Sequence, residues 1–591
     1  MRQISSLILA GMFLLVAGCS SDIDPVEVRT DDSGEPTIVE QGAPFEAATD
    51  DLRALPVIFD ARLDDDDQFT VELADVFDAD VYVGPSDDAG DPHHISRARV
   101  VDEQDDTVWT QRLNSHYQLL EFLTPVIDEF MPDSLNVTVE LLYQLVLEDY
   151  PEMLAFPAKV PVAVDGADRY QLEIRLEDGE WVQVAEYDIA ELKEQARSPR
   201  PDADYHIEPL VDHGPPESSI NVAILGDGYT EEEREEFEKD ARTVSDRLLD
   251  ASPIAEHADL FNVNKIWTPS NESGAGYDCN HVGADPDCEQ DFRDTAFRTT
   301  FVIPAIADEY GFPIDDISDR VAMPLDIADI YEIAALAAYD EVIMIANSDK
   351  FSGFAGAYVA MVTNYDDRER FPDTAVHEVG HTLGLLGDEY YVQQDACYYH
   401  EPTIPLPVNI ATRDDAEQDD DEFKWAEWVD DDTPMPTPSY FSDFGDGHQV
   451  GAFSPAYNCD FLVRPVDECM MKSSGEDFCP VCAQQMVRRF YSLIPPSDGS
   501  GLHVDVRADG TVEVSAPVRD NAATDRYELH WTVDGEPVDT DAETLQIDRS
   551  DLDDDQWTDI SVTIRNNSEF LRIHDHVVES SFDAQIRLPS N

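Results

Sequence analysis

Positive charge is scarce in this chain of 591 residues. It contains 37 Lys and Arg residues against 128 Asp and Glu, which gives a formal net charge of −91, and only seven of the cations are lysines. Nucleic acids and anionic lipid surfaces repel a polyanion of this size, so the composition argues against both as binding partners. An acidic surface with little lysine suits saline surroundings, where salt screens the repulsion between carboxylates. We therefore expect a protein that works in a saline environment and binds no nucleic acid.

Long hydrophobic runs are also lacking, because no segment reaches the roughly 20 apolar residues that span a membrane. An apolar run near the N-terminus ends in "LVAGC" and has the length of a secretory signal. "LVAGC" resembles a lipobox, in which the thiol of Cys19 is acylated and residues 1–18 are removed; the alternative is an ordinary signal peptide. The following acidic stretch, 19–55, lacks periodicity and is predicted to be a flexible tether. We expect an exported protein that is lipid-anchored to the cell envelope, at the outer membrane or the cell surface.

Cysteine is infrequent, and its pattern is poor in paired metal-binding motifs. The chain has eight cysteines, so seven remain if Cys19 carries lipid. A zinc knuckle usually needs two Cys pairs, whereas the chain has a single CxxC, "CPVC" at 479–482, with no thioredoxin-like pattern around it. In an exported protein, structural disulfides are the favoured interpretation, for example between Cys279 and Cys288. The odd number leaves one thiol unassigned.

The length predicts several domains, since single cores rarely exceed about 250–300 residues. The Pro-containing stretches 197–204 and 494–501 are typical of linkers. Residues 56–200 contain the hairpin pattern "RYQLEIRLEDGEWVQVAEYDI" and are predicted to form a mainly-β domain. Residues 502–591 carry short alternating strands separated by turns, which favours an immunoglobulin-like β-sandwich with Trp531 in its core.

The segment between the linkers, 206–495, has the pattern of an α/β domain. "INVAILGDGYTEEEREEFEKDARTVSDRLLD" predicts a buried strand, a Gly turn and a helix, with Thr230 and Glu233 forming a capping box. "EVIMIA" (341–346) is a second buried strand, and the Gly-rich "FSGFAGAYVAMV" (351–362) is predicted to contain an edge strand. Strands that alternate with helices predict an α/β architecture.

The stretch "HEVGHTLGLLGDEY" carries the motif with the clearest chemistry. On a helix, His377 and His381 lie about 40° apart at about 100° per residue, so both imidazoles face one point. Such a pair supplies two nitrogen ligands to zinc, and Glu378 is placed to reach a water molecule rather than the metal, as a general base does. The alternative is an ordinary surface helix with a chance pair of histidines.

A catalytic zinc site needs a third protein ligand. Gly384 is able to end the helix in a left-handed turn, after which the chain doubles back toward the histidines. Two acids follow this turn. We predict Asp388 as the third ligand and Glu389 as its support, with Glu389 as the alternative ligand and a solvated acidic turn as the alternative for both.

The segment 206–495 resembles the IgA-peptidase family of bacterial zinc metallopeptidases in several blocks that occur in the same order. Besides the stretches around Thr230 and His377, these blocks are "SPIAEHADLFNVNKIWTPSNESG", "FKWAEWV", "GAFSPAYNCDFLVRPVDECMM" and "FCPVC". The resemblance covers about 206–495. It implies a metzincin-like α/β protease domain that holds zinc on His377, His381 and Asp388 and uses Glu378 as the catalytic base. It thus implies a zinc endopeptidase that acts on protein or peptide substrates.

The resemblance also implies roles for residues outside the helix. Met470 or Met471 would form the hydrophobic turn beneath the metal, with ordinary core packing as the alternative. "SGFAGAYVAM" would pair with an extended substrate. Tyr390, Tyr391 and His400 are candidates for substrate contacts or, equally, for packing.

Two alternatives stay open. The acidic insertion 413–434 lacks EF-hand spacing, which favours a solvated loop over a structural calcium site. The chain as a whole could instead be a catalytically silent surface lipoprotein that recognises polymers through its β-domains. The presence of His377, Glu378, His381 and Asp388 together favours the enzyme.

Overall fold

The computed structural model describes most of the chain from residue 25 to residue 587. The described ranges are 25–30, 36–40, 53–63, 69–79, 81–83, 96–112, 155–162, 166–175, 181–199, 205–277, 291–301, 322–356, 359–365, 368–390, 406–418, 423–438, 449–456, 459–497, 501–507, 510–519, 526–552, 556–573 and 577–587. The expected signal peptide with Cys19, the expected Cys279–Cys288 pair, Tyr391 and His400 lie outside these ranges. Among the described residues, no helix combines the length and the apolarity that crossing a membrane requires.

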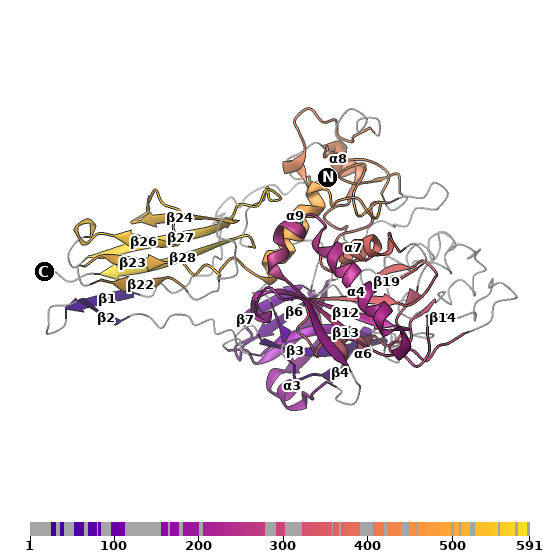
Figure 1. Ribbon diagram of the computed structural model, residues 1–591. Coiled ribbons are helices and arrows are strands. Elements are labelled where there is room, and N and C mark those ends of the chain that lie inside the picture. Colours follow the sequence, from indigo (N-terminus) through magenta and orange to yellow (C-terminus); the bar gives the residue numbers. More distant parts are fainter. Residues whose placement is uncertain are drawn as a thin grey trace, which may run out of the picture.

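A six-stranded sheet forms the centre of the molecule (Figure 1). The strand order is β11 (His206–Val211), β13 (Phe261–Trp267), β12 (Ile220–Asp227), β17 (Glu341–Ala346), β19 (Val359–Thr363) and β18 (Gly353–Gly356). The four middle strands are parallel, and the two edge strands run antiparallel to their neighbours. Every residue of the three strands from β12 to β19 is buried, as expected for a parallel sheet covered on both faces. The predicted α/β architecture is thereby confirmed.

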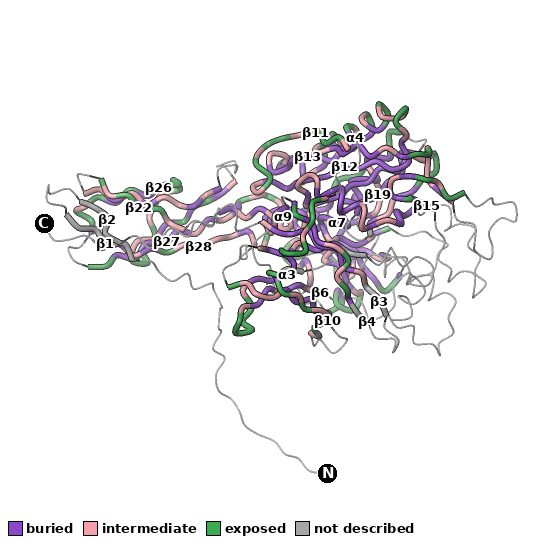
Figure 2. Tube along the Cα trace, turned by 90° about the horizontal axis from the view of Figure 1, so that it is seen from below, coloured by how far each residue is buried: buried purple, intermediate pink, exposed green. Residues whose placement is uncertain are grey.

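Successive side chains of the central strands enter two different cores. Val222 and Ile224 of β12 belong to one core, together with the helices α4 (Arg234–Leu249), α7 (Phe371–Thr382) and α9 (Pro480–Leu493). Ala223 and Leu225 belong to the other, which contains α6 (Ile327–Ala334) and the N-terminal strands. This alternation follows from the two-residue period of a strand. Figure 2 shows the buried chain concentrated around these elements.

The described residues between 53 and 199 form mainly strands. One sheet contains β3 (Arg53–Leu63), β4 (Phe69–Val76), β5 (Val81–Tyr82) and β8 (Ala155–Pro161). The other contains β6 (Ser96–Val101), β7 (Thr107–Arg112), β9 (Arg169–Arg175) and β10 (Trp181–Asp188), which is followed by α3 (Ile189–Gln195). The antiparallel pairing of β9 with β10 confirms the predicted hairpin. Lys159 and Arg197 join this segment to the central domain through Asp340 (2.8 Å) and Glu332 (2.7 Å).

The C-terminal segment forms two sheets around shared buried side chains. One contains β22 (His503–Val506), β23 (Val512–Ser515) and β26 (Thr544–Ile547). The other contains β24 (Tyr527–Val533), β25 (Glu536–Pro537), β27 (Trp557–Asn566) and β28 (Glu579–Arg587). Trp531 is buried between them, as predicted, and its indole N–H donates to the carbonyl of Ala542 (2.9 Å).

Part of the expected tether takes up regular structure. β1 (Pro25–Thr30) pairs in parallel with β28, and β2 (Pro36–Glu40) pairs with β1, so both extend the C-terminal sheet (Figure 1). The prediction of a tether without structure does not hold for these two strands. The physical reason is that β28 offers an open edge of backbone donors and acceptors, which a segment distant in sequence can complete.

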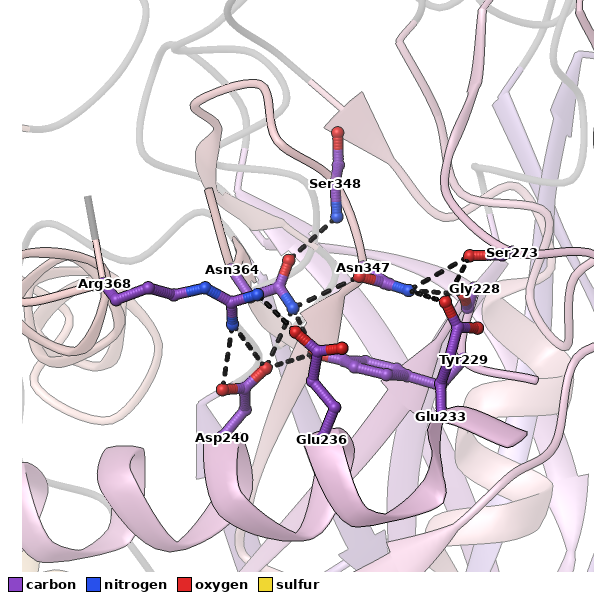
Figure 3. Close-up of polar contacts among 10 residues, drawn as sticks. All are labelled: Gly228, Tyr229, Glu233, Glu236, Asp240, Ser273, Asn347, Ser348, Asn364 and Arg368. Atoms are coloured by element: carbon purple, nitrogen blue, oxygen red, sulfur yellow. Dashed lines mark hydrogen bonds and ion pairs between the residues drawn. The ribbon is translucent and has the colours of Figure 1, made fainter. Parts of the chain in front are cut away.

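A polar network fixes the chain that leads into α7 (Figure 3). Arg368, which precedes α7, forms an ion pair with Asp240 of α4 (2.8 Å). Asp240 also accepts from the Tyr229 hydroxyl (2.9 Å) and from the Asn364 amide (2.9 Å). At the other end of the network, the predicted capping box forms, because the Glu233 carboxylate accepts from the Thr230 backbone N–H (2.8 Å). The network therefore fixes the start of α7 against α4.

Candidate metal centre

Helix α7 carries the two histidines through the interior of the domain. It begins at Phe371 with Pro372 in its first turn, where a missing N–H costs nothing. Asp373 pairs with Arg247 of α4 (2.5 Å), and nearly every other residue of the helix is buried. A helix held on so many sides presents its side chains in fixed positions.

Three potential ligand atoms converge at one point beside α7. His377 Nε2 and His381 Nε2 lie 3.2 Å apart. Asp388 Oδ1 lies 3.1 Å from the first nitrogen and 3.3 Å from the second. The three residues that were predicted as ligands are thus brought together, and a site for one ion is formed by their side chains.

The other ring nitrogens orient the two imidazoles. His377 Nδ1 lies 2.8 Å from the carbonyl oxygen of Met470, and His381 Nδ1 lies 2.7 Å from that of Leu386. A carbonyl only accepts, so each Nδ1 carries the proton and each Nε2 is left with a lone pair for a metal. The donor set of two neutral imidazole nitrogens and one carboxylate oxygen fits zinc.

The charges of the site are strongly coupled. Burial alone would raise the pKa of Asp388, but the neighbouring imidazoles hold it well below its usual range. Burial lowers the pKa of His377, but the hydrogen bond to Asp388 together with the negative charges of Glu378 and Asp388 raises it overall. Without a cation, a proton shared among these groups offsets the charge of Asp388. A bound cation would do the same.

Glu378 directly follows His377 on α7. Its side chain is buried, and that burial raises the pKa of its carboxyl, while both imidazoles act in the opposite direction. A Cβ atom on Gly353 would lie 2.4 Å from Glu378 Oε1, so the carboxyl sits directly against the edge strand β18. The glycine leaves room for it there.

The turn after α7 differs from the prediction in one detail. The residue in the left-handed conformation is Leu385 (φ 55°), not Gly384. Leu385 N–H donates to the carbonyl of His381 (3.1 Å), which is the hydrogen bond of an αL helix ending, and Leu386 N–H donates to that of Gly380 (3.1 Å). Gly384 is needed for space instead, because a Cβ there would lie 2.5 Å from Met486 Sδ and 2.6 Å from the Gly380 carbonyl oxygen.

The two candidate methionines are both buried and do different things. Met470 supplies the carbonyl that orients His377. The Met471 side chain packs under α7, where a Cβ on Gly380 would lie 2.5 Å from its sulfur. The methionine pair therefore lies beneath the histidines. The sequence did not indicate which of the two orients His377 and which packs against α7.

Glu389 does not face the histidines. Its carboxylate Oε1 accepts from the Asn409 amide (2.9 Å) and lies 3.2 Å from Cys482 Sγ. Burial raises the pKa of Glu389 well above its usual value. Asn409, which sequence reasoning missed because no motif marks it, also donates to the Gly387 carbonyl (2.8 Å) and accepts from the Gly387 N–H (2.9 Å). It thereby holds the turn that presents Asp388.

The expectation of structural disulfides is wrong for three cysteines. Cys469, Cys479 and Cys482 are buried free thiols, whereas Cys459 is disulfide-bonded. The three thiols gather around Glu389, because the turn after α7 and the start of α9 meet there. The CxxC spacing of Cys479 and Cys482 was visible in the sequence. Cys469 and Glu389, which complete the cluster, lie elsewhere in the chain.

The remaining sequence candidates have simpler surroundings. Tyr390 is 37% exposed at the end of the turn. In the acidic insertion, α8 (Arg413–Gln418) is mostly exposed, but Trp425 is fully buried and its indole N–H donates to the Gly451 carbonyl (2.7 Å). The expected solvated loop is thus anchored by an aromatic core residue. Within the described ranges, the two groups of side chains that could hold an ion are the histidine site and the cysteine cluster.

A comparison with family models gives a match to the central part of the chain. No curated protein was found to match the chain. A family model described as IgA Peptidase M64 matches residues 208–446, a segment that includes the central sheet, α7 and Asp388 but ends before Met470 and the three clustered cysteines. The domain that contains the histidine site is a member of the IgA peptidase M64 family.

Proposed function

We propose that this protein is an exported zinc-dependent endopeptidase in which His377, His381 and Asp388 hold the ion and Glu378 is the general base. The observation that carries the proposal is the convergence of two Nε2 atoms and Asp388 Oδ1 next to the buried carboxyl of Glu378, whose pKa both imidazoles lower. Membership of a peptidase family supports peptide-bond hydrolysis as the reaction.

The chain's own residues would share the work as follows. Zinc, when bound, polarises the scissile carbonyl and lowers the pKa of water toward about 7. Glu378 accepts a proton from the attacking water and delivers it to the departing amine nitrogen. Met470 and Leu386 keep both imidazoles in the tautomer that exposes Nε2. Asn409 maintains the turn that carries Asp388.

The substrate would bind as an additional strand. β18 lies at the end of the strand order and pairs with β19 on one side. Its Gly353 is adjacent to Glu378, so a peptide aligned along the free edge of β18 would pass the general base. Backbone pairing of this kind selects extended segments of protein and peptide substrates.

The remaining parts of the proposal concern architecture and location. The parallel sheet with α7 and the methionine pair supports a metzincin-like domain, and the two C-terminal sheets support an immunoglobulin-like module. "LVAGC" supports a lipid anchor at Cys19, and the charge of −91 supports a saline setting outside the cell. The membrane anchor would place the protease at the cell envelope.

The test is a substitution that leaves the ligands intact. Glu378→Gln keeps size and polarity but cannot accept a proton, so zinc should be retained while cleavage of a broad peptide library falls by at least about 10²–10⁴-fold. Glu369→Gln, at an exposed acid just before α7, is the matched control and should leave both unchanged. If the wild type holds zinc but cleaves no peptide at any salt concentration, the chain is a surface-binding protein instead.

A further inference from the structure

Three thiols and one carboxyl group form a second buried cluster. Cys469, Cys479, Cys482 and Glu389 are at most 1% exposed, and one ligand atom of each lies within 4.8 Å of the others. The residues come from three segments: the turn after α7, the loop that carries Met470, and the start of α9. None of them is a ligand in the histidine site.

The separation of Cys469 and Cys482 is that of two metal ligands rather than of a disulfide. Cys469 Sγ lies 3.8 Å from Cys482 Sγ, whereas bonded sulfurs lie about 2.05 Å apart. A tetrahedral ion with Zn–S bonds of about 2.3 Å separates its sulfur ligands by about 3.8 Å. Glu389 Oε1, at 3.2 Å from Cys482 Sγ, occupies the remaining corner of such an arrangement.

Backbone groups favour the thiolate form of two of the cysteines. The Cys479 N–H donates to Cys469 Sγ (3.3 Å), and the Cys482 N–H donates to Cys479 Sγ (3.5 Å). Cys479 caps the N-terminus of α9, where the helix dipole stabilises negative charge. A thiolate is the form that binds metal.

The carboxyl group of Glu389 supplies an independent indication. It is fully buried, and its Oε2 atom has no hydrogen-bond partner among the described residues. A buried polar atom without a partner costs free energy, and a carboxylate in an apolar core costs more unless its charge is compensated. A cation at the centre of the cluster would satisfy it.

We propose that Cys469, Cys479, Cys482 and Glu389 bind a second, structural Zn²⁺ ion. Thiolates select soft or borderline ions, and three thiolates with one carboxylate suit tetrahedral zinc. Four protein ligands leave no open position, so the ion has a structural role and not a catalytic one. The proposal does not depend on whether the chain cleaves peptides.

The second ion would fix both sides of the histidine site. Glu389 follows Asp388 directly in the chain, and Cys469 precedes Met470, whose carbonyl orients His377. The Glu389 N–H also donates to the Met471 carbonyl (2.8 Å). Binding at the cluster therefore joins the turn with the third ligand to the loop beneath the helix.

Cobalt replacement in the full mature chain tests the proposal without any mutation. The metal-free protein, kept reduced, is titrated with Co²⁺. We expect two Co²⁺ per chain and a strong near-ultraviolet sulfur-to-cobalt charge-transfer band, which the histidine site cannot produce because it has no thiolate. Absence of this band when two ions are bound, or saturation at one ion, overturns the proposal. So does a disulfide among the three cysteines in protein purified without reductant.

Two variants separate the sites. Cys479→Ser combined with Cys482→Ser should retain one ion per chain and lose the charge-transfer band. Asp388→Ala should also retain one ion but keep the band at full strength. If the double variant does not fold, alkylation of the wild type decides. Bound zinc should protect the three thiols from alkylation, and removal of the zinc by a chelator should make them reactive. Equal labelling with and without chelator contradicts the second site, whereas loss of peptide cleavage alone concerns only the first.

Discussion

Asp388 and Glu389 are neighbours in the chain but belong to two clusters with different chemistry. The Asp388 side chain is 15% exposed and joins two imidazoles, whereas Glu389 is fully buried and joins three thiols. The first set offers three ligands, which leaves one position of a tetrahedral ion open, and the second offers four. The two side chains point to different clusters, so a single turn serves both.

The comparison distinguishes a catalytic metal site from a structural one. A catalytic metal needs an open position, and a structural metal needs none. In this protein the cysteine cluster and the histidine site are connected through Met470 and the turn after α7. The following substitutions are designed to affect one cluster at a time.

Asp388→Ala should have the largest effect. It removes the third ligand of the histidine site, so the affinity for that zinc and the peptidase activity should both be lost, by at least about 10²-fold in kcat/KM. Metal analysis and peptide cleavage measure this. Retention of full zinc content by Asp388→Ala, together with its loss in Glu389→Ala, would exchange the roles of the two acids.

Gly353→Ala should reduce activity without removing metal. The new Cβ would lie 2.4 Å from Glu378 Oε1 and 2.6 Å from Thr374 Cγ2, so the general base must move. A displacement of this kind costs on the order of 10²-fold in rate. Steady-state kinetics with zinc analysis checks it. Unchanged kcat would show that Glu378 does not depend on this contact.

Substitution by glutamine allows two other buried glutamates, Glu341 and Glu389, to be compared. Glu341 of β17 accepts a hydrogen bond from Thr382, and burial raises the pKa of its carboxyl well above the usual value. The folded state therefore keeps a proton that the unfolded chain releases, and this contribution to stability declines as pH rises from about 4.3 through the folded-state pKa. Glu341→Gln should remove the decline, with an unfavourable slope of up to about 1.4 kcal/mol per pH unit in the wild type.

Glu389→Gln should behave in the opposite way. If Glu389 is a zinc ligand, the amide weakens the cluster, and the protein should lose about 1–3 kcal/mol of unfolding free energy at neutral pH. Thermal melts of both variants between acidic and mildly alkaline pH provide the comparison. Stabilisation of both variants alike at neutral pH would mean that Glu389 is a protonated buried acid and no ligand.

Added salt should have the smallest and most diffuse effect. With a net charge of −91, the melting temperature should rise between dilute buffer and molar salt, because the ions screen repulsion between carboxylates. The increase should be equal in wild type and Asp388→Ala, since it arises from the whole surface. A flat melting temperature would remove the argument for a saline habitat.

Local patterns were sufficient for much of the fold and for half of the site. The strand and helix around Thr230, the hairpin of β9 and β10, and the buried strand β17 all have short-range signals, and each forms as predicted. The pairing of β1 with β28 was not predictable, since nothing in either segment names its partner. The left-handed residue at Leu385 was missed because the rule that assigns this conformation to glycine describes a preference, which tertiary packing overrides.

The amino-acid sequence by itself determined the part of the chemistry that depends on helical periodicity. His377 and His381 face one point because they lie one turn apart, and Glu378, as the residue after His377, lies to one side of both on the helix surface. Tertiary structure alone decided which carbonyl orients His377, which atoms surround Glu389 and that the three cysteines stay free. Both the His377–Met470 contact and the Glu389–Cys482 contact join residues 93 positions apart. Contacts over such separations depend on how whole elements pack against the sheet, which no local pattern contains.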